Sequence, residues 1–204
     1  MKRLVCLSLF LLLVLSIFVF DVHGSVQSNS NIVNSLTGGQ ASDIVFQEDA
    51  QDKLQFGGSW AAVVDGSSSS GLAMEAANSS ANGGRLFGPY LLNGSDELPL
   101  AGKPFVAVFR LKVTSNASLG NVVYIDVSYN GGIPIQLMTI KANNFALPNV
   151  WQDFQLPFVA PDPLTAGLEF RIINQNNGVT DVFADEVTVY KAWAASVLYE
   201  EGAY

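Results

Sequence analysis

The side chains that most often carry chemistry are scarce in this sequence. The chain has 204 residues, with one cysteine, Cys6, and one histidine, His23. Both precede Ser25, and the segment before Ser25 is expected to be removed as a signal peptide. The mature chain would then contain no thiol and no imidazole. Disulfides, Ser-His-Asp or Cys-His catalysis and histidine-ligated zinc are therefore excluded from it.

Carboxylates are the next candidates, because two of them about 5 to 10 Å apart can hydrolyse a glycosidic bond. The acidic residues available on expected strands include Glu75, Asp126, Asp153 and Glu169. None lies in a recognisable catalytic motif, and acidic residues on the outer faces of strands are usually solvated. The sequence therefore favours a protein that is not an enzyme.

The first 24 residues have the pattern of a secretory signal peptide. Lys2 and Arg3 precede an apolar run over residues 4–20, and short side chains follow at Val22 and Gly24. An uncleaved membrane anchor is the alternative, because the run nearly reaches the ~20 residues of a spanning helix. Either interpretation predicts a secreted or extracellular protein. Residues 25–43, rich in Ser, Asn, Gln and Gly, are expected to form a flexible lead-in.

The composition is that of a folded acidic protein. Hydrophobic residues make up 49% of the chain and charged residues 14%, and the net charge is −8. These proportions favour a globular domain over a disordered one. Nucleic acid and anionic lipid are poor partners for such a surface. Neutral polysaccharides, cations and basic proteins remain as candidate partners.

The clearest structural signal is a two-residue alternation at the end of segment 84–113. Phe105, Phe109 and Leu111 fall on one side of an extended strand, whereas Arg110 and Lys112 fall on the other. This pattern predicts an antiparallel sheet with one buried and one solvated face. Around ten such strands, separated by turn-forming segments, predict an all-β, two-sheet antiparallel sandwich over residues 44–190. Its expected core is Phe105, Phe109, Leu111, Ile125, Val127, Phe154, Leu156, Phe170, Val187 and Val189.

Short motifs along this segment form a recognisable series. They are Glu48, Asp49 and Ala50 in the first strand, Gly88, Pro89 and Tyr90 ahead of the strand FRLKV, Trp151 with Phe154, and the closing Asp185, Val187 and Val189. Over about residues 44–190 the chain resembles the galactose-binding-like jelly rolls of carbohydrate-binding modules, especially families 6 and 35. The resemblance implies a jelly-roll fold and a module that binds polysaccharide or another glycan without changing it.

The resemblance also implies a structural calcium ion that joins the first strand to the last. Asp185 fits the closing motif of such a site, and Glu48 and Asp49 are its opening candidates. Phe46 occupies the place of the first glutamate, although a register moved by one would put Gln47 and Asp49 on one strand face. Calcium takes six to eight oxygen ligands, so carboxylates and amides there are suitable. The alternative is that Glu48 and Asp49 only mark a strand end.

A sugar site needs aromatic platforms beside hydrogen-bonding side chains, because pyranose rings have apolar C–H faces and a fringe of hydroxyls. In the similar modules, the loop before the last strand supplies an asparagine to the ligand. The candidates here are Asn174, Asn176 and Asn177 in that loop, with Trp60, Tyr90 and Trp151 as platforms. The alternative is that the tryptophans belong to the core and that the Asn-Gly loop is only a turn.

Two further features concern the surface. Sequons at Asn78, Asn93 and Asn116 fall in predicted loops, so N-glycosylation is expected in a eukaryotic host. The tail, residues 191–204, is expected to pack on its own domain, with pairing to another subunit's sheet edge as the alternative.

Three functions are consistent with the sequence. The favoured one is a secreted, non-catalytic carbohydrate-binding module. The second is a structural protein of a cell surface or extracellular matrix that binds no sugar and self-associates. The third is a small jelly-roll glycosidase or polysaccharide lyase.

Overall fold

The structure is a computed structural model that describes residues 44–52, 54–91, 101–175 and 178–192. The expected signal peptide and lead-in, nearly all of the tail, and Asn93, Asn176 and Asn177 lie outside these residues. Within the described part of the chain, no helix is long and apolar enough to cross a membrane.

Twelve strands of the described chain form two six-stranded antiparallel sheets. Sheet A has the order β10-β7-β12-β4-β3, with β1 also paired to β12. Its strands are β1 (Ile44–Asp49), β3 (Trp60–Val64), β4 (Leu72–Ala76), β7 (Pro104–Val113), β10 (Gln152–Val159) and β12 (Val182–Lys191). Sheet B has the order β2-β5-β11-β8-β9, with β6 also paired to β11. Its strands are β2 (Gln55–Gly57), β5 (Arg85–Phe87), β6 (Pro89–Leu91), β8 (Asn121–Tyr129), β9 (Ile133–Lys141) and β11 (Leu168–Asn174).

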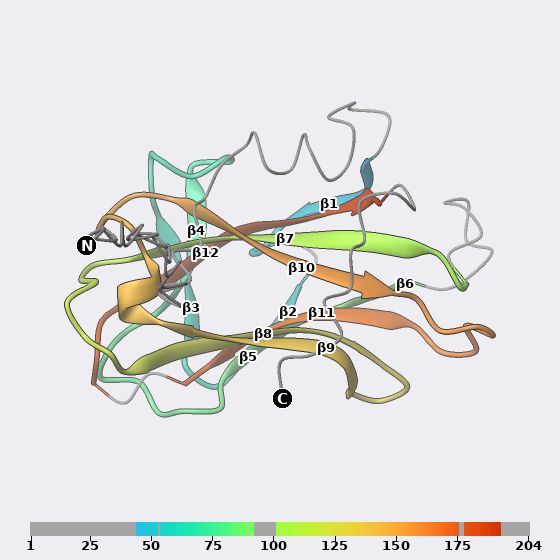
Figure 1. The fold of residues 1–204 in the computed structure, drawn as a ribbon. Coiled ribbons are helices and arrows are strands. Elements are labelled where there is room, and N and C mark those ends of the chain that lie inside the picture. The colour runs from blue at the N-terminus through green and yellow to red at the C-terminus, as the bar shows by residue number, and fades with distance from the viewer. Residues whose placement is uncertain (1–43, 53, 92–100, 176–177, 193–204) are drawn as a thin grey trace, which may run out of the picture.

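The two sheets lie face to face as the layers of a sandwich (Figure 1). One layer carries β7, β10 and β12, and the other carries β8, β9 and β11. A single 3₁₀ turn, Ala142–Asn144, follows β9 in the described chain. The predicted all-β, two-sheet antiparallel sandwich is confirmed.

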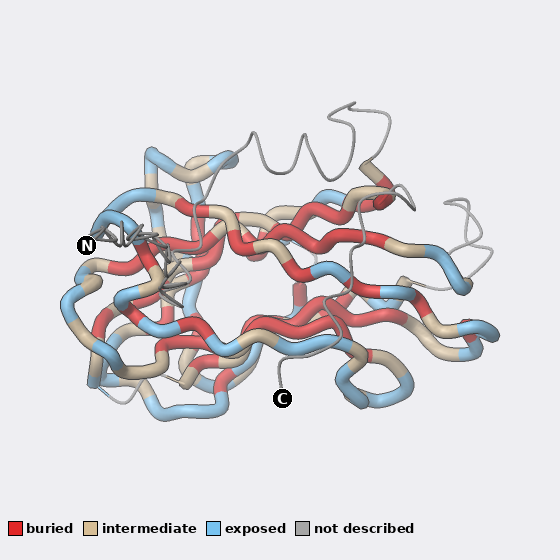
Figure 2. The backbone as a smooth tube through the Cα atoms, viewed as in Figure 1, coloured by how far each residue is buried: buried red, intermediate tan, exposed pale blue. Residues whose placement is uncertain are grey.

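The core fills the space between the sheets, where the facing strands are buried (Figure 2). Every residue predicted for the core is at most 3% exposed. Aromatic rings join the two layers, since Phe46 of β1 and Phe158 of β10 both contact Phe170 of β11, at centroid distances of 5.6 and 6.0 Å. The inner face predicted from apolar residues at every second strand position is therefore confirmed.

The expectation of a solvated outer face on β7 is wrong. Val106, Val108 and Lys112 lie on that face, and all three are buried. Strand β7 is central, between β10 and β12, and the outer-face valines pack against Tyr190 and Ala192. Lys112 is covered because its ammonium pairs with Asp65, in the loop that follows β3.

Two strand boundaries also differ from the expectation. The short strand β2 was not predicted, and residues 85–91 divide into β5 and β6 at Gly88. Gly88 has a φ of 129°, which interrupts the extended chain. Both halves pair with β11, so the division brings the β5–β6 segment along one side of that strand.

Candidate functional site

A cavity of about 240 Å³ opens on the outer face of sheet B. We call it the sheet-B pocket, and its lining residues are Arg85, Phe87, Tyr90, Gly131, Gly132, Glu169 and Arg171. Strand β11 positions two of them by simple alternation. Leu168, Phe170 and Ile172 point into the core, so Glu169 and Arg171 between them point outward.

Arg171 is held by a two-pronged ion pair with Asp126 on the neighbouring strand β8. Its Nε lies 2.7 Å from Oδ1 of Asp126, and its Nη2 lies 2.5 Å from Oδ2. The two residues are direct cross-strand partners and both are buried. The hydrogen bonds to Asp126 raise the pKa of Arg171, so its guanidinium stays charged. A pair with this geometry fixes the side chain in one orientation.

The third guanidinium nitrogen of Arg171 lies at the turn between β8 and β9. Asn130, Gly131 and Gly132 all have positive φ there, as a tight hairpin requires. A Cβ at Gly132 would lie 2.5 Å from Nη1 of Arg171. Glycine is therefore needed at position 132 to let the backbone approach the guanidinium.

Glu169 is the least expected member of the pocket. It is only 5% exposed, yet within the described residues its side chain forms no hydrogen bond and no close ion pair. The charge of Glu169 acts on Arg171 at longer range and raises the pKa of that guanidinium. The hydroxyl of its cross-strand neighbour Ser128 is buried without a partner in the described chain, but Ser128 does not line the pocket. Polar groups left without partners at a cavity are candidates for ligand contacts.

Tyr90 forms the aromatic side of the pocket. Its side chain is 43% exposed, and its φ of 71° is unusual for a bulky residue. A Cβ at Gly167 would come within 2.7 to 2.9 Å of Tyr90 backbone and Cβ atoms, so only glycine fits beside it. Such backbone strain persists where the surroundings hold it, often at ligand sites. Of the three predicted platforms, Tyr90 is the one that lies in the pocket.

The prediction of Trp60 and Asn174 as sugar contacts is wrong, because both side chains are buried. Trp60 is 3% exposed and packs in the core, so its ring offers no surface to a ligand. Asn174 is fully buried, and its amide donates to Oγ of Ser59 and to the carbonyl of Ala81. As the last residue of β11, Asn174 shares the inward face of Phe170 and Ile172. Its role is to tie the chain around residues 59 and 81 to sheet B.

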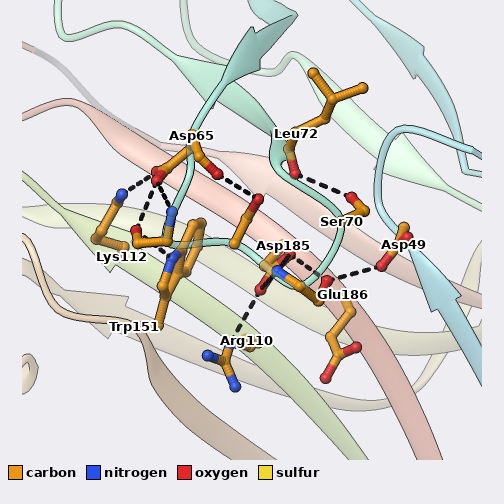
Figure 3. Close-up of polar contacts among 12 residues, drawn as sticks. Asp49, Asp65, Ser70, Leu72, Arg110, Lys112, Trp151, Asp185 and Glu186 are labelled. Atoms are coloured by element: carbon orange, nitrogen blue, oxygen red, sulfur yellow. Dashed lines mark hydrogen bonds and ion pairs between the residues drawn. The ribbon is translucent and has the colours of Figure 1, made fainter.

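Trp151, the remaining predicted platform, lies on the opposite side of the molecule. Its indole N–H donates to Oγ of Ser67 at 3.0 Å, and Nζ of Lys112 lies 4.4 Å from its ring centroid (Figure 3). Lys112 also pairs with Asp65. The ring is therefore partly covered by the serine-rich loop, residues 65–71, over the outer face of sheet A.

Two of the three predicted calcium residues, Asp49 and Asp185, meet under the same loop. Asp185 is fully buried, and its carboxylate accepts hydrogen bonds from the backbone N–H and the hydroxyl of Ser69. The Ser69 hydroxyl also lies 2.9 Å from Oδ1 of Asp49 (Figure 3). A backbone hydrogen bond joins the same segments, since the N–H of Ala50 donates to the carbonyl of Asp185 at 2.7 Å. First and last strands are thus joined at the predicted residues, through a serine.

The donor set around Asp185 does not fit a calcium ion. Nε of Arg110 lies 3.0 Å from Oδ2 of Asp185, although its N–H does not point at that oxygen, so the contact is electrostatic. A guanidinium at that distance repels a second cation. Within the described residues, no three acidic, histidine or cysteine side chains are placed together to hold a metal. Calcium binding by Glu48, Asp49 and Asp185 stays a prediction of the sequence.

The predicted sequons differ in accessibility. Asn78 is exposed in the turn after β4. The amide nitrogen of Asn116, to which a glycan would be attached, donates to the carbonyl of Phe145 at 2.9 Å and also contacts that of Ala146. Asn78 is therefore the more accessible of the two acceptors in the described chain.

Six of the seven lining residues were not predicted as a ligand site: Arg85, Phe87, Gly131, Gly132, Glu169 and Arg171. The segment LEFRII does carry a signal, because opposite charges alternate with core residues at Glu169 and Arg171. The partner of Arg171 is 45 residues away, at Asp126, so no local spacing connects them. The pairing of β8 with β11 was needed to bring the charges together.

The fold matches known carbohydrate-binding modules. The family 35 module from Clostridium thermocellum has a TM-score of 0.51 and 16% sequence identity, over 71% of this chain and 98% of the module. The Agl-KA catalytic domain has a TM-score of 0.50 and 12% identity, over 74% of this chain but only 28% of that chain. A family 16 module matches at a TM-score of 0.47 and 15% identity, over 76% and 99% of the two chains. No known family pattern and no curated protein matches the sequence.

At these identities the two matches with TM-scores of 0.51 and 0.50 establish the fold and nothing finer. The chain is a jelly roll of the type found in carbohydrate-binding modules, similar to family 35, as the sequence resemblance implied.

Proposed function

We propose that this protein is a secreted, non-catalytic module that binds a polysaccharide or glycan at the sheet-B pocket. The observation that carries the proposal is the composition of that pocket. An exposed aromatic ring, Tyr90, lies beside Arg85, Arg171 and a buried carboxylate, Glu169. A few convergent polar groups next to an aromatic surface are the usual pattern of a small-ligand site.

The carboxylates around the pocket support a binding role over hydrolysis. Glu169 is the one acidic side chain among the residues described as lining the pocket. Both oxygens of nearby Asp126 are engaged by Arg171. A glycosidase needs two carboxyl groups that act on the substrate, as acid with base or nucleophile. The pocket offers one.

The affinity is expected to be micromolar or weaker. Sugar hydroxyls are well solvated in water, so each hydrogen bond gains only about 1 kcal/mol on binding. Stacking on one ring adds a similar amount. The proposal requires no calcium. Secretion follows from the signal-peptide pattern of residues 1–24, and Asn78 is the first sequon to examine for a glycan.

The test is a glycan array and a pull-down on insoluble polysaccharides with the purified protein, compared with Tyr90→Ala and Trp151→Ala variants. We expect binding that Tyr90→Ala abolishes and Trp151→Ala leaves intact. The opposite result would move the site to sheet A. No binding in either assay, with assembly into ordered particles or filaments, would instead support a structural matrix protein.

A further inference from the structure

We infer that the sheet-B pocket binds a single unit of a neutral sugar through two neighbouring hydroxyls, one donating to Glu169 and the other accepting from Arg171. This inference rests on the proposed function and specifies the ligand class of the same pocket. Three features carry it: a carboxylate in the pocket wall without a hydrogen-bond donor from the described chain, a fixed guanidinium with one nitrogen unused by Asp126, and a balance of charge.

The carboxylate of Glu169 opens to the pocket and has no hydrogen-bond donor in the described chain. A ligand in the pocket would displace water from this carboxylate, and a charged group that loses water without gaining hydrogen bonds is destabilised. Glu169 is 5% exposed and lines the pocket, but no described side chain or backbone N–H donates to its carboxylate. A ligand that donates hydrogen bonds there would compensate the burial, so this carboxylate selects for a donor.

Arg171 presents the complementary group. Its Nε and Nη2 are taken by Asp126, which leaves Nη1 at the Gly131–Gly132 turn in the wall of the same pocket. Because the ion pair fixes the guanidinium plane, little side-chain entropy is lost when Nη1 donates to a ligand. The ligand must therefore donate to Glu169 and accept from Arg171. A hydroxyl can do either, and adjacent hydroxyls of a sugar ring can do both at once.

The charges around the pocket exclude strong selection for an ionic ligand. Arg85 and Arg171 are positive, whereas Glu169 and Asp126 are negative, so the local sum is zero. A uronic acid would face Glu169 within a chain of net charge −8, and an amino sugar would face both arginines. Each ionic sugar would be repelled by one set of charges about as strongly as it is attracted by the other. A neutral sugar meets neither repulsion.

The size of the pocket limits how much of a glycan it covers. Its volume of about 240 Å³ falls below the roughly 300–1,000 Å³ of drug-sized ligand sites. One sugar ring, stacked on Tyr90, suits that space. The pocket is therefore expected to recognise a chain end or a short branch, with little added affinity from further units along the chain.

The experiment titrates the purified full chain with galactose, mannose, glucose and xylose, and with galacturonic and glucuronic acid, by chemical-shift perturbation. We expect at least one neutral sugar to bind and each uronic acid to bind more weakly than its neutral parent. Glu169→Gln keeps the size of the side chain but replaces an acceptor oxygen by a donor, so it should weaken binding about ten-fold or more.

The matched control is Glu75→Gln, the same change on β4 of the other sheet, which should leave binding unchanged. Thermal melting of both variants separates lost binding from lost folding. A native melting curve with unchanged affinity in Glu169→Gln would overturn the inference, and so would a uronic acid that outcompetes its neutral parent. In both cases the proposed function would stand. If the wild-type chain binds none of these sugars and no polysaccharide, the proposed function fails as well.

Discussion

At the scale of single residues, the ion pair between Arg171 and Asp126 places two opposite charges in the protein interior. Its carboxylate accepts two hydrogen bonds from one guanidinium, and both groups are removed from water. Such a pair need not stabilise the fold relative to apolar residues, but loss of one partner leaves the other charge buried alone. The pair therefore fixes Arg171 in the pocket wall, and replacement of either residue is expected to destabilise the fold.

Replacement of Arg171 by Ala is expected to lower the free energy of unfolding by about 3–5 kcal/mol, because Asp126 would remain buried without its partner. Urea denaturation followed by fluorescence measures the change. Arg85→Ala is the control: Arg85 also lines the pocket but is exposed, so its removal should cost less than about 0.5 kcal/mol. Equal stability of Arg171→Ala and the wild type would contradict the assignment of a buried pair.

At the scale of elements, the serine-rich loop 65–71 acts as a cover fixed to sheet A. Ser67, Ser68 and Ser69 each form a hydrogen bond to an aspartate of the loop or of β12. Asp65 also pairs with Lys112 of β7, whose ammonium lies over Trp151. The loop therefore accounts for the burial of charged groups on a sheet face that was expected to be solvated.

This loop should make the free energy of unfolding depend on pH. Burial alone would raise the pKa of Asp65, but hydrogen bonds from Lys112 and Ser67 lower it from 3.8 to about 2. The contribution of Asp65 is therefore present above pH 3.8 and is lost as the pH falls through about 2. In Asp65→Asn we expect about 1.5–3 kcal/mol less stability at neutral pH.

Urea unfolding of wild type and Asp65→Asn at several pH values measures that difference. It should shrink steadily between neutral pH and about pH 2. A difference that stays constant over this range would show that Asp65 contributes no charge-dependent stability.

At the scale of the whole molecule, one inter-sheet core holds the sandwich together without a disulfide in the described chain. Phe109 lies at its centre on β7 and is fully buried. Phe109→Ala is expected to cost about 3–5 kcal/mol, from lost burial and the residual cavity. Chemical denaturation measures this loss, with Leu119→Ala as the control because Leu119 is exposed. A Phe109→Ala cost near that of Leu119→Ala would contradict the core assignment.

The junction between the first and last strands also belongs to this scale. Because Arg110 already contacts Asp185, we expect the melting temperature to be unchanged by chelator or by added calcium. An ion that bound only the native state would raise the melting temperature by mass action. A rise on calcium addition that Asp185→Asn abolishes would establish the calcium site that the sequence resemblance implied.

The sequence by itself determined the sheet class, most strand positions and the inward faces of β7, β8, β10, β11 and β12. Alternation is a local property, so Phe105, Phe109 and Phe170 could be assigned to the core from their neighbours alone. The same alternation indicated that Glu169 and Arg171 point away from the core. The closing motif at Asp185 likewise placed the junction of the first and last strands, although not the group that joins them.

Tertiary structure decided which outward-facing groups meet. Whether Trp60 or Tyr90 is exposed depends on what packs over each ring, and only the assembled sheets show that Trp60 is covered. Arg171 meets Asp126 because β8 pairs with β11, and Arg110 meets Asp185 because β7 pairs with β12. Long-range strand pairing sets these contacts, and it depends on the packing of the whole chain and not on any local spacing of residues.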